Sequence, residues 1–210
     1  MARGAAQSYA LGTLGPLSCA NSVEAGMTIG RVFVAASLDG FIARARTVPS
    51  TGSFPMRCGD EDHGYDDSIA GVDGLVMGRA TYETVLGFGD WPYTQPVVVM
   101  SQSLVDADVP QHLRHRVRIS ADRPSEIVNT LQAEGWRAAY IDGGAVIRSF
   151  LSVGLIGRIT LTLVPILLGY GRPLFAAIGR GLGLEREAVR SHDNCCVSIE
   201  YRVLPIPRNA

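Results

Sequence analysis

The chain has 210 residues, 47% of them hydrophobic and 19% charged, and its formal net charge is -1 at pH 7. This balance is typical of one globular domain with a sizeable core, and it lacks the basic surplus that nucleic-acid binding usually requires. No apolar run reaches the roughly 18 residues of a membrane-spanning helix. We therefore expect a protein that contacts neither nucleic acid nor membrane.

The four cysteines, Cys19, Cys58, Cys195 and Cys196, include no Cys-x-x-Cys pair, and none of the four histidines begins a His-x-Glu motif. This spacing argues against a zinc site, a disulfide framework and a zinc deaminase. We expect no bound metal and a cytoplasmic location, where thiols stay reduced.

The first 26 residues are rich in Ala, Gly and Ser, with Arg3 and Glu24 as their only charged residues. We expect residues 1–26 to form a disordered tail; the alternative is an upstream start before a natural Met27. Gly12 and Pro16 interrupt the mildly apolar stretch, which argues against a signal peptide. One domain is expected over residues 27–206.

From Thr28 onward, short apolar runs alternate with helical patterns. In chain order they predict strand 31–38, loop 44–59, helix 60–70, strand 74–77, helix 79–86, strands 96–101 and 117–120, helix 124–134, strand 138–141 and helix 145–153. Strand 158–168, a glycine-rich loop and an alternating hairpin over 185–203 follow, with Asp193-Asn194 as the turn. This order indicates an α/β fold with a largely parallel sheet.

Two of these strands end in glycine and lead straight into a helix. At Gly78-Arg79-x-Thr81, an arginine and a hydroxyl lie in the first helical turn, which suits a phosphate monoester. At Gly143-Gly144, paired glycines let a pyrophosphate lie against the backbone at the positive end of the next helix. The alternatives are a helix start with a surface arginine and a tight strand-to-helix turn. The full Gly-x-Gly-x-x-Gly pattern is absent, so a Rossmann fold is not supported.

Five motifs occur in the order found in one known family. They are Ala-Ala-Ser-Leu-Asp-Gly-Phe-Ile-Ala (35–43), Met-Gly-Arg-x-Thr-Tyr-Glu (77–83), Val-Val-Val-Met-Ser (97–101), Ile-Asp-Gly-Gly (141–144) and Leu-Val-Pro-x-Leu-Leu-Gly-x-Gly-x-Pro-Leu-Phe (163–175). From about Thr28 to Leu204 the chain resembles the dihydrofolate-reductase-like superfamily. More closely, it resembles the group that shares the C-terminal reductase domain of the bacterial bifunctional riboflavin-biosynthesis deaminase/reductase.

The resemblance implies an α/β fold with a central mixed, mostly parallel sheet, flanking helices and an antiparallel C-terminal hairpin, often as a homodimer. It also implies NADPH as the cofactor. By resemblance, Ala36 is expected near the nicotinamide, Gly78, Arg79 and Thr81 near the adenosine 2′-phosphate, Ser101 near the adenosine ribose-phosphate, and Gly143, Gly144, Ala145 and Val146 near the pyrophosphate.

Two carboxylates are candidates for the catalytic role of contacting the substrate and supporting its protonation. Asp62 precedes Gly78 by 16 residues (62 to 78), a spacing close to that of the substrate-binding carboxylate in dihydrofolate reductases. Asp39 belongs to the Ser-Leu-Asp-Gly segment of the resemblance, at the strand end that faces the cleft, and is a candidate for contact with the substrate or the cofactor. The alternatives are an ordinary acidic helix start for Asp62 and a turn-forming role for Asp39.

We therefore expect an NADPH-dependent reductase that transfers hydride to a small heterocyclic substrate, pterin- or pyrimidine-like, or to a carbonyl substrate. The loop over 44–59 departs from many relatives, so no relative's substrate is transferred to this chain. Two alternatives stay open: a catalytically silent nucleotide-binding scaffold of the same fold, and a pyrimidinone reductase of riboflavin biosynthesis.

Overall fold

The computed structural model describes residues 29–43, 64–176, 178–179 and 181–205. The expectations about the tail over 1–26, the loop over 44–59 and the carboxylate of Asp62 lie outside these residues.

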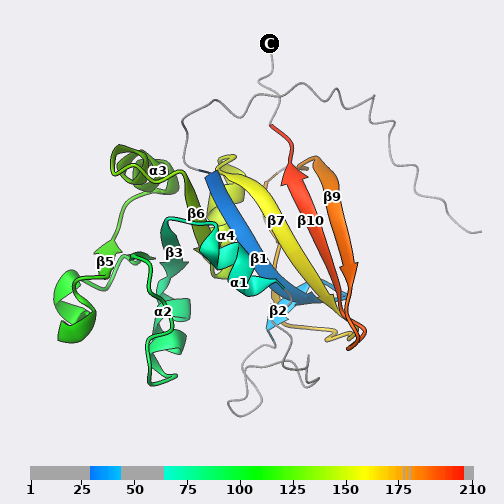
Figure 1. Ribbon diagram of the computed structural model, residues 1–210, viewed down its shortest axis with the longest axis horizontal. Coiled ribbons are helices and arrows are strands. Elements are labelled where there is room, and N and C mark those ends of the chain that lie inside the picture. Colours follow the sequence, from blue (N-terminus) through cyan, green and yellow to red (C-terminus); the bar gives the residue numbers. More distant parts are fainter. Residues whose placement is uncertain (1–28, 44–63, 177, 180, 206–210) are drawn as a thin grey trace, which may run out of the picture.

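One eight-stranded sheet forms the centre of the molecule, in the order β5-β4-β3-β6-β1-β7-β10-β9 (Figure 1). The strands from β5 to β7 run parallel, whereas β10 is antiparallel to both of its neighbours. The predicted mixed, mostly parallel sheet with a C-terminal hairpin is confirmed. The strands are β1 (Ile29–Ser37), β3 (Gly74–Gly78), β4 (Val97–Met100), β5 (Val117–Ser120), β6 (Ala138–Asp142), β7 (Ile156–Val164), β9 (Leu184–Ser191) and β10 (Val197–Val203).

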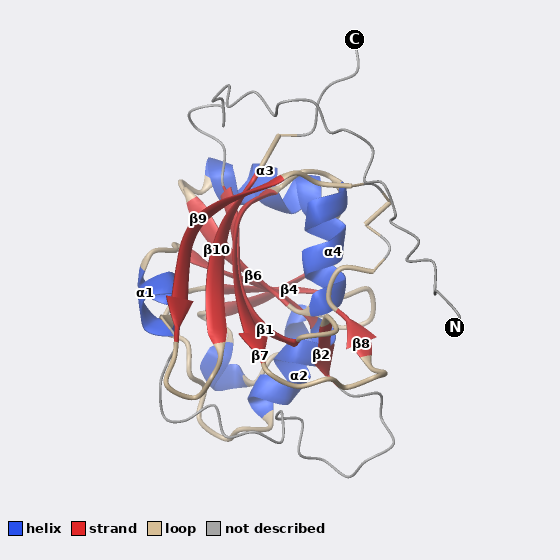
Figure 2. Ribbon diagram, turned by 90° about the vertical axis from the view of Figure 1, so that its right-hand side faces the viewer, coloured by secondary structure: helices blue, strands red, loops and turns tan. Residues whose placement is uncertain are grey.

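Helices cover both faces of this sheet, and Figure 2 shows α1 and α4 on opposite sides of it. The helices α3 (Pro124–Ala133) and α4 (Gly144–Ser152) pack on one face, where Leu131 and Phe150 are fully buried. The helices α1 (Tyr65–Ala70) and α2 (Arg79–Leu86) belong to the other face, where Tyr82 and Tyr140 are buried. Successive side chains of a strand point to opposite faces, so strands covered on both faces are apolar throughout.

A second, two-stranded sheet joins β2 (Phe41–Ala43) to β8 (Arg172–Pro173). The Leu174 N–H donates to the Gly40 carbonyl at 2.9 Å and closes this sheet. The sequence analysis did not predict it, because strands of two or three residues carry no periodic signal.

The predicted bounds of β7, residues 158–168, were wrong at both ends, since the strand begins at Ile156. β7 ends at Val164 rather than at residue 168, because Pro165 has no N–H to continue the ladder. The helix predicted over 60–70 is described only from Tyr65, after Gly64 in a left-handed conformation.

The connection between β4 and β5 contains two short 3₁₀ helices, Asp106–Asp108 and Gln111–Leu113. Arg114 donates to the carbonyls of Ala107 and Val109, and Arg118 pairs with Glu134 at 2.6 Å. These arginines therefore stabilise the connection and the edge of the sheet. Across the described part of the chain, no helix is long and apolar enough to pass through a membrane.

Candidate active site

The two glycine junctions of the sequence lie side by side at the carboxyl edge of the sheet. β3 and β6 are neighbours, with Met77 paired to Asp142, so Gly78 and Gly143 follow on adjacent strands. A Cβ atom on Gly143 would lie 2.8 Å from the Thr81 Oγ1 and 3.6 Å from the Gly78 backbone nitrogen. The helices α2 and α4 therefore begin at the same place. Their first-turn N–H groups, which have no carbonyl partner within a helix, create one joint edge suited to an anion.

Both glycines at the start of α4 also have a structural reason of their own. Gly143 has φ 87°, a left-handed conformation that side chains rarely adopt. At Gly144, a Cβ atom would lie 2.6 Å from the Cδ1 of Ile42, which comes from β2. Backbone conformation at Gly143 and packing at Gly144 thus account for both glycines without a ligand, and their contact with a pyrophosphate stays a prediction.

The remaining small residues predicted at the cofactor differ in accessibility. Ala36 and Val146 are buried in the core between the sheet and α4. Ala145 is exposed in the first turn of α4. Any contact of Ala36 or Val146 with a cofactor would therefore come from their backbone atoms.

Arg79 lies at the first position of α2 with half of its side chain exposed. Its Nε donates to the Glu83 Oε1 at 2.6 Å, and its Nη1 donates to the Ser103 Oγ at 2.8 Å. The guanidinium is thus held in one orientation beside an exposed hydroxyl. This pair of donors suits a phosphate monoester, which needs charge and several hydrogen bonds.

Ser101 directly follows β4, and its predicted contact with the adenosine ribose-phosphate stays a prediction. Ser101 is buried, and its Oγ accepts hydrogen bonds from the backbone N–H groups of Ser103 and Leu104 at 3.2 and 3.0 Å. Ser101 therefore shapes the turn after β4, while Ser103 offers its hydroxyl beside Arg79. The sequence analysis missed Ser103; the only signal for it is the Ser-x-Ser spacing at the end of a buried strand.

Asp39 follows β1 at the same edge of the sheet, and its carboxylate has three internal donors. The Ser37 hydroxyl donates to Oδ1 at 2.5 Å, the Leu168 N–H donates to Oδ1 at 3.1 Å, and the Gly169 N–H donates to Oδ2 at 2.7 Å. The hydrogen bond from Ser37, reinforced by the two backbone N–H groups, lowers the pKa of Asp39 below its usual value. The carboxylate is therefore ionised and links two loops; its predicted contact with substrate stays untested.

Asp142 is the carboxyl group that the sequence analysis did not single out. It ends β6 immediately before Gly143, whose N–H donates to its Oδ1 at 2.6 Å. Burial raises the pKa of Asp142, although the Gly143 N–H acts in the opposite direction. The signal in the sequence is an acidic residue that directly follows the apolar run of a buried strand.

Three tyrosines on the α1 side of the sheet lie within range of the charge of Asp142. Tyr65 and Tyr93 share a hydrogen bond, and the Tyr140 hydroxyl donates to the Phe33 carbonyl at 2.8 Å. Burial raises the pKa of all three phenols, and the negative charge of Asp142 adds to the shift. For Asp142 itself, desolvation is the cause that favours the protonated form.

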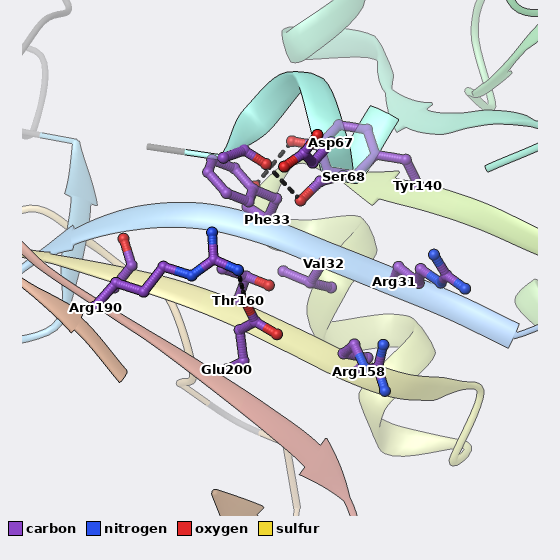
Figure 3. A pocket seen from close by; sticks show the side chains of 12 residues that line it. Arg31, Val32, Phe33, Asp67, Ser68, Tyr140, Arg158, Thr160, Arg190 and Glu200 are labelled. Atoms are coloured by element: carbon purple, nitrogen blue, oxygen red, sulfur yellow. Dashed lines mark hydrogen bonds and ion pairs between the residues drawn. The ribbon is translucent and has the colours of Figure 1, made fainter. Parts of the chain in front are cut away.

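A pocket of about 170 Å³ lies farther along the same face, between α1 and the strands β1, β7, β9 and β10 (Figure 3). Tyr140 lines it, but none of the predicted site residues does. Arg190 pairs with Glu200 at 3.4 Å, and Arg31 donates to the Gly71 carbonyl. Because none of the predicted cofactor-binding residues lines this pocket, we place the candidate site at the carboxyl edge of the sheet.

Within the described residues, no group of three or more His, Cys, Asp or Glu side chains is placed to hold a metal ion. The residues that the structure does bring together are Gly78, Arg79, Thr81, Gly143, Gly144 and Ala145, joined by Ser103, Ile42 and Asp142.

Comparison with known proteins assigns this arrangement to a family. The family model of the RibD C-terminal domain matches residues 29–194. The uncharacterized protein YwjB of Bacillus subtilis (strain 168) is 29% identical over 147 residues, which cover 69% of this chain and 80% of that protein.

Solved structures agree with this assignment. A protein of Shewanella sp. PV-4, named for riboflavin biosynthesis, is 34% identical with a TM-score of 0.76, and the match covers 85% of this chain and 100% of that one. A pyrimidine reductase-like protein of Corynebacterium diphtheriae shares the fold, with 18% identity, a TM-score of 0.60, and coverage of 85% and 93%. The chain therefore belongs to the RibD C-terminal domain family and has its dihydrofolate-reductase-like fold.

Proposed function

We propose that this protein is an NADPH-dependent reductase that acts on a small heterocyclic or carbonyl substrate. The observation that carries the proposal is the convergence of two helix starts, at Gly78 and Gly143, with Arg79 beside one of them. A dinucleotide with an extra phosphate needs one site for its pyrophosphate and a second, cationic site for the monoester. The reductase-like fold of the family supports the same assignment.

Different residues of this chain would bind different parts of the cofactor. Arg79 and Ser103 would bind the 2′-phosphate, and the first-turn N–H groups of α2 and α4 would bind the pyrophosphate. When bound, NADPH supplies the hydride, so the protein has to orient it and supply a proton. Asp142 is the described carboxyl group best suited to hold that proton, because burial keeps its pKa raised at the same edge of the sheet.

Calorimetric titration of the full chain with NADPH and NADH tests the cofactor assignment. We expect NADPH to bind at least about tenfold more tightly, because a charge-assisted hydrogen bond contributes about 1.5–3 kcal/mol. Equal affinities would refute the assignment of the 2′-phosphate, and no binding of either would refute the proposed function.

Turnover tests the reductase activity itself. The protein is mixed with NADPH and with pterin-like, pyrimidine-like and carbonyl compounds in turn, and the loss of reduced nicotinamide is followed by absorbance. Oxidation of NADPH in the presence of only one of these compound classes would identify the substrate class. Tight NADPH binding without oxidation in any mixture would instead support the catalytically silent scaffold.

A further inference from the structure

The segments after β1 and after β7 are joined by one connected set of hydrogen bonds. Ser37 Oγ donates to Asp39 and also accepts from the Phe41 N–H at 3.0 Å. Asp39 accepts from the N–H groups of Leu168 and Gly169, which lie 129 and 130 residues away in the sequence. One carboxylate thus fixes the β1–β2 turn and the loop after β7 together.

The same two segments continue into the small sheet of β2 and β8. Phe41 pairs with Pro173, and the Leu174 N–H donates to the Gly40 carbonyl. From α4, Arg148 donates to the Pro173 carbonyl at 3.0 Å. The small sheet is therefore held between the Asp39 carboxylate and α4.

This sheet places Ile42 directly against Gly144, since a Cβ atom on Gly144 would lie 2.6 Å from the Ile42 Cδ1. Gly144 begins α4, at the edge where the proposed nucleotide site lies. The position of Ile42, and so the shape of that edge, depends on the turn that Asp39 closes.

We propose that Asp39 is a positioning residue: through its hydrogen bonds to Ser37, Leu168 and Gly169 it holds the β2–β8 sheet, and with it Ile42, against Gly144. This inference rests on the proposed function for its effect on NADPH binding, while the hydrogen-bond network can be tested without any ligand.

Asp39→Asn is the sharpest perturbation. An ionised carboxylate only accepts hydrogen bonds, whereas one side of the asparagine amide is an NH₂ donor. If the NH₂ group takes the place of Oδ1, it faces the Leu168 N–H; if it takes the place of Oδ2, it faces the Gly169 N–H. At least one main-chain hydrogen bond is therefore lost. In hydrogen exchange of the full chain, we expect the Leu168 and Gly169 amides to exchange about tenfold faster or more, and the Leu174 amide to exchange faster as well. Faster exchange confined to Leu168 and Gly169, or no change at all, would overturn the inference.

A double-mutant cycle gives the functional readout. We expect Asp39→Asn and Ile42→Ala each to weaken NADPH binding by at least about twofold, and the double variant to bind no more weakly than Ile42→Ala alone, because Asp39 acts through Ile42. Additive losses would instead mean that Asp39 contacts the ligand directly, which overturns the positioning role. If the wild-type protein binds no NADPH, the proposed function fails, and the exchange at Leu174 still decides whether Asp39 holds the small sheet.

Discussion

Replacing Arg79 with alanine removes the cation that would recognise the extra phosphate of NADPH. In the free protein this guanidinium is half exposed, and its ion pair with Glu83 contributes only about 0.3–0.5 kcal/mol, so the variant should fold normally. A hydrogen bond between charged groups contributes about 1.5–3 kcal/mol, and about 1.4 kcal/mol changes a dissociation constant tenfold. We therefore expect the Kd for NADPH to rise by a factor of about 10 to 150, while the Kd for NADH, which has no 2′-phosphate, changes less than about twofold.

Calorimetric titration of wild type and variant with both dinucleotides measures this difference. Arg158→Ala is the matched control, because Arg158 is exposed to a similar degree (47%) and is likewise ion-paired, at 2.9 Å to Glu187. It lies on β7 away from the candidate site, so both affinities should stay unchanged. Glu83→Gln removes the carboxylate that competes with a phosphate for Arg79, and we expect it to tighten NADPH binding. Equal losses for NADPH and NADH in Arg79→Ala would contradict the reasoning.

Three further predictions concern stability, measured by urea denaturation. Burial raises the pKa of Asp142, so the folded state disfavours its ionised form. We therefore expect Asp142→Asn to be more stable than wild type at pH 7. This difference in stability should vanish as the pH falls below 3.8, the ordinary pKa of an aspartate side chain. Asp73→Asn should instead be less stable than wild type at pH 7, because the hydrogen bond from the Ala138 N–H lowers the pKa of Asp73 and so favours its ionised form in the folded state. Wild type should lose this advantage in stability as the pH falls through the lowered pKa. Gly74→Ala should destabilise the protein by about 1–3 kcal/mol, since its Cβ would lie 2.1 Å from the Trp136 ring and 2.6 Å from the Pro96 carbonyl oxygen. A loss under about 0.5 kcal/mol would contradict this reasoning, because the ring and the Pro96 backbone would both have to move at almost no cost.

Much of the fold could be predicted because its main elements are long enough to show a period or a continuous apolar run. The buried strands β3, β4, β5 and β6 were predicted within about a residue, as was the start of α3 at Pro124. Local rules failed where the element was short or its partner distant. Nothing local indicates that Phe41 pairs with Pro173, because a two-residue strand exists only through its neighbour.

The residues of the candidate site could likewise be predicted where the pattern is local, and not where their role depends on distant residues. Gly78 and Arg79 could be found from the sequence, because a glycine between an apolar strand and a helix is a local pattern with a local reason. Ser103 and Asp142 were missed, because the role of Ser103 depends on a guanidinium 24 residues away and the role of Asp142 depends on desolvation in the folded chain.

By itself, the sequence determined the alternation of strands and helices and the two glycine junctions, since these depend on side-chain period and backbone freedom within a few residues. Only the tertiary structure decided that the junctions adjoin, because the order β3-β6-β1 places strands next to each other that are far apart along the chain. It also gave the Asp39 carboxylate its partners 129 and 130 residues away and desolvated the half-buried Asp142. Hydrogen-bond partners and desolvation are properties of the packed chain. They distinguish Asp39, an ionised carboxylate that links two loops, from Asp142, whose raised pKa favours the protonated form.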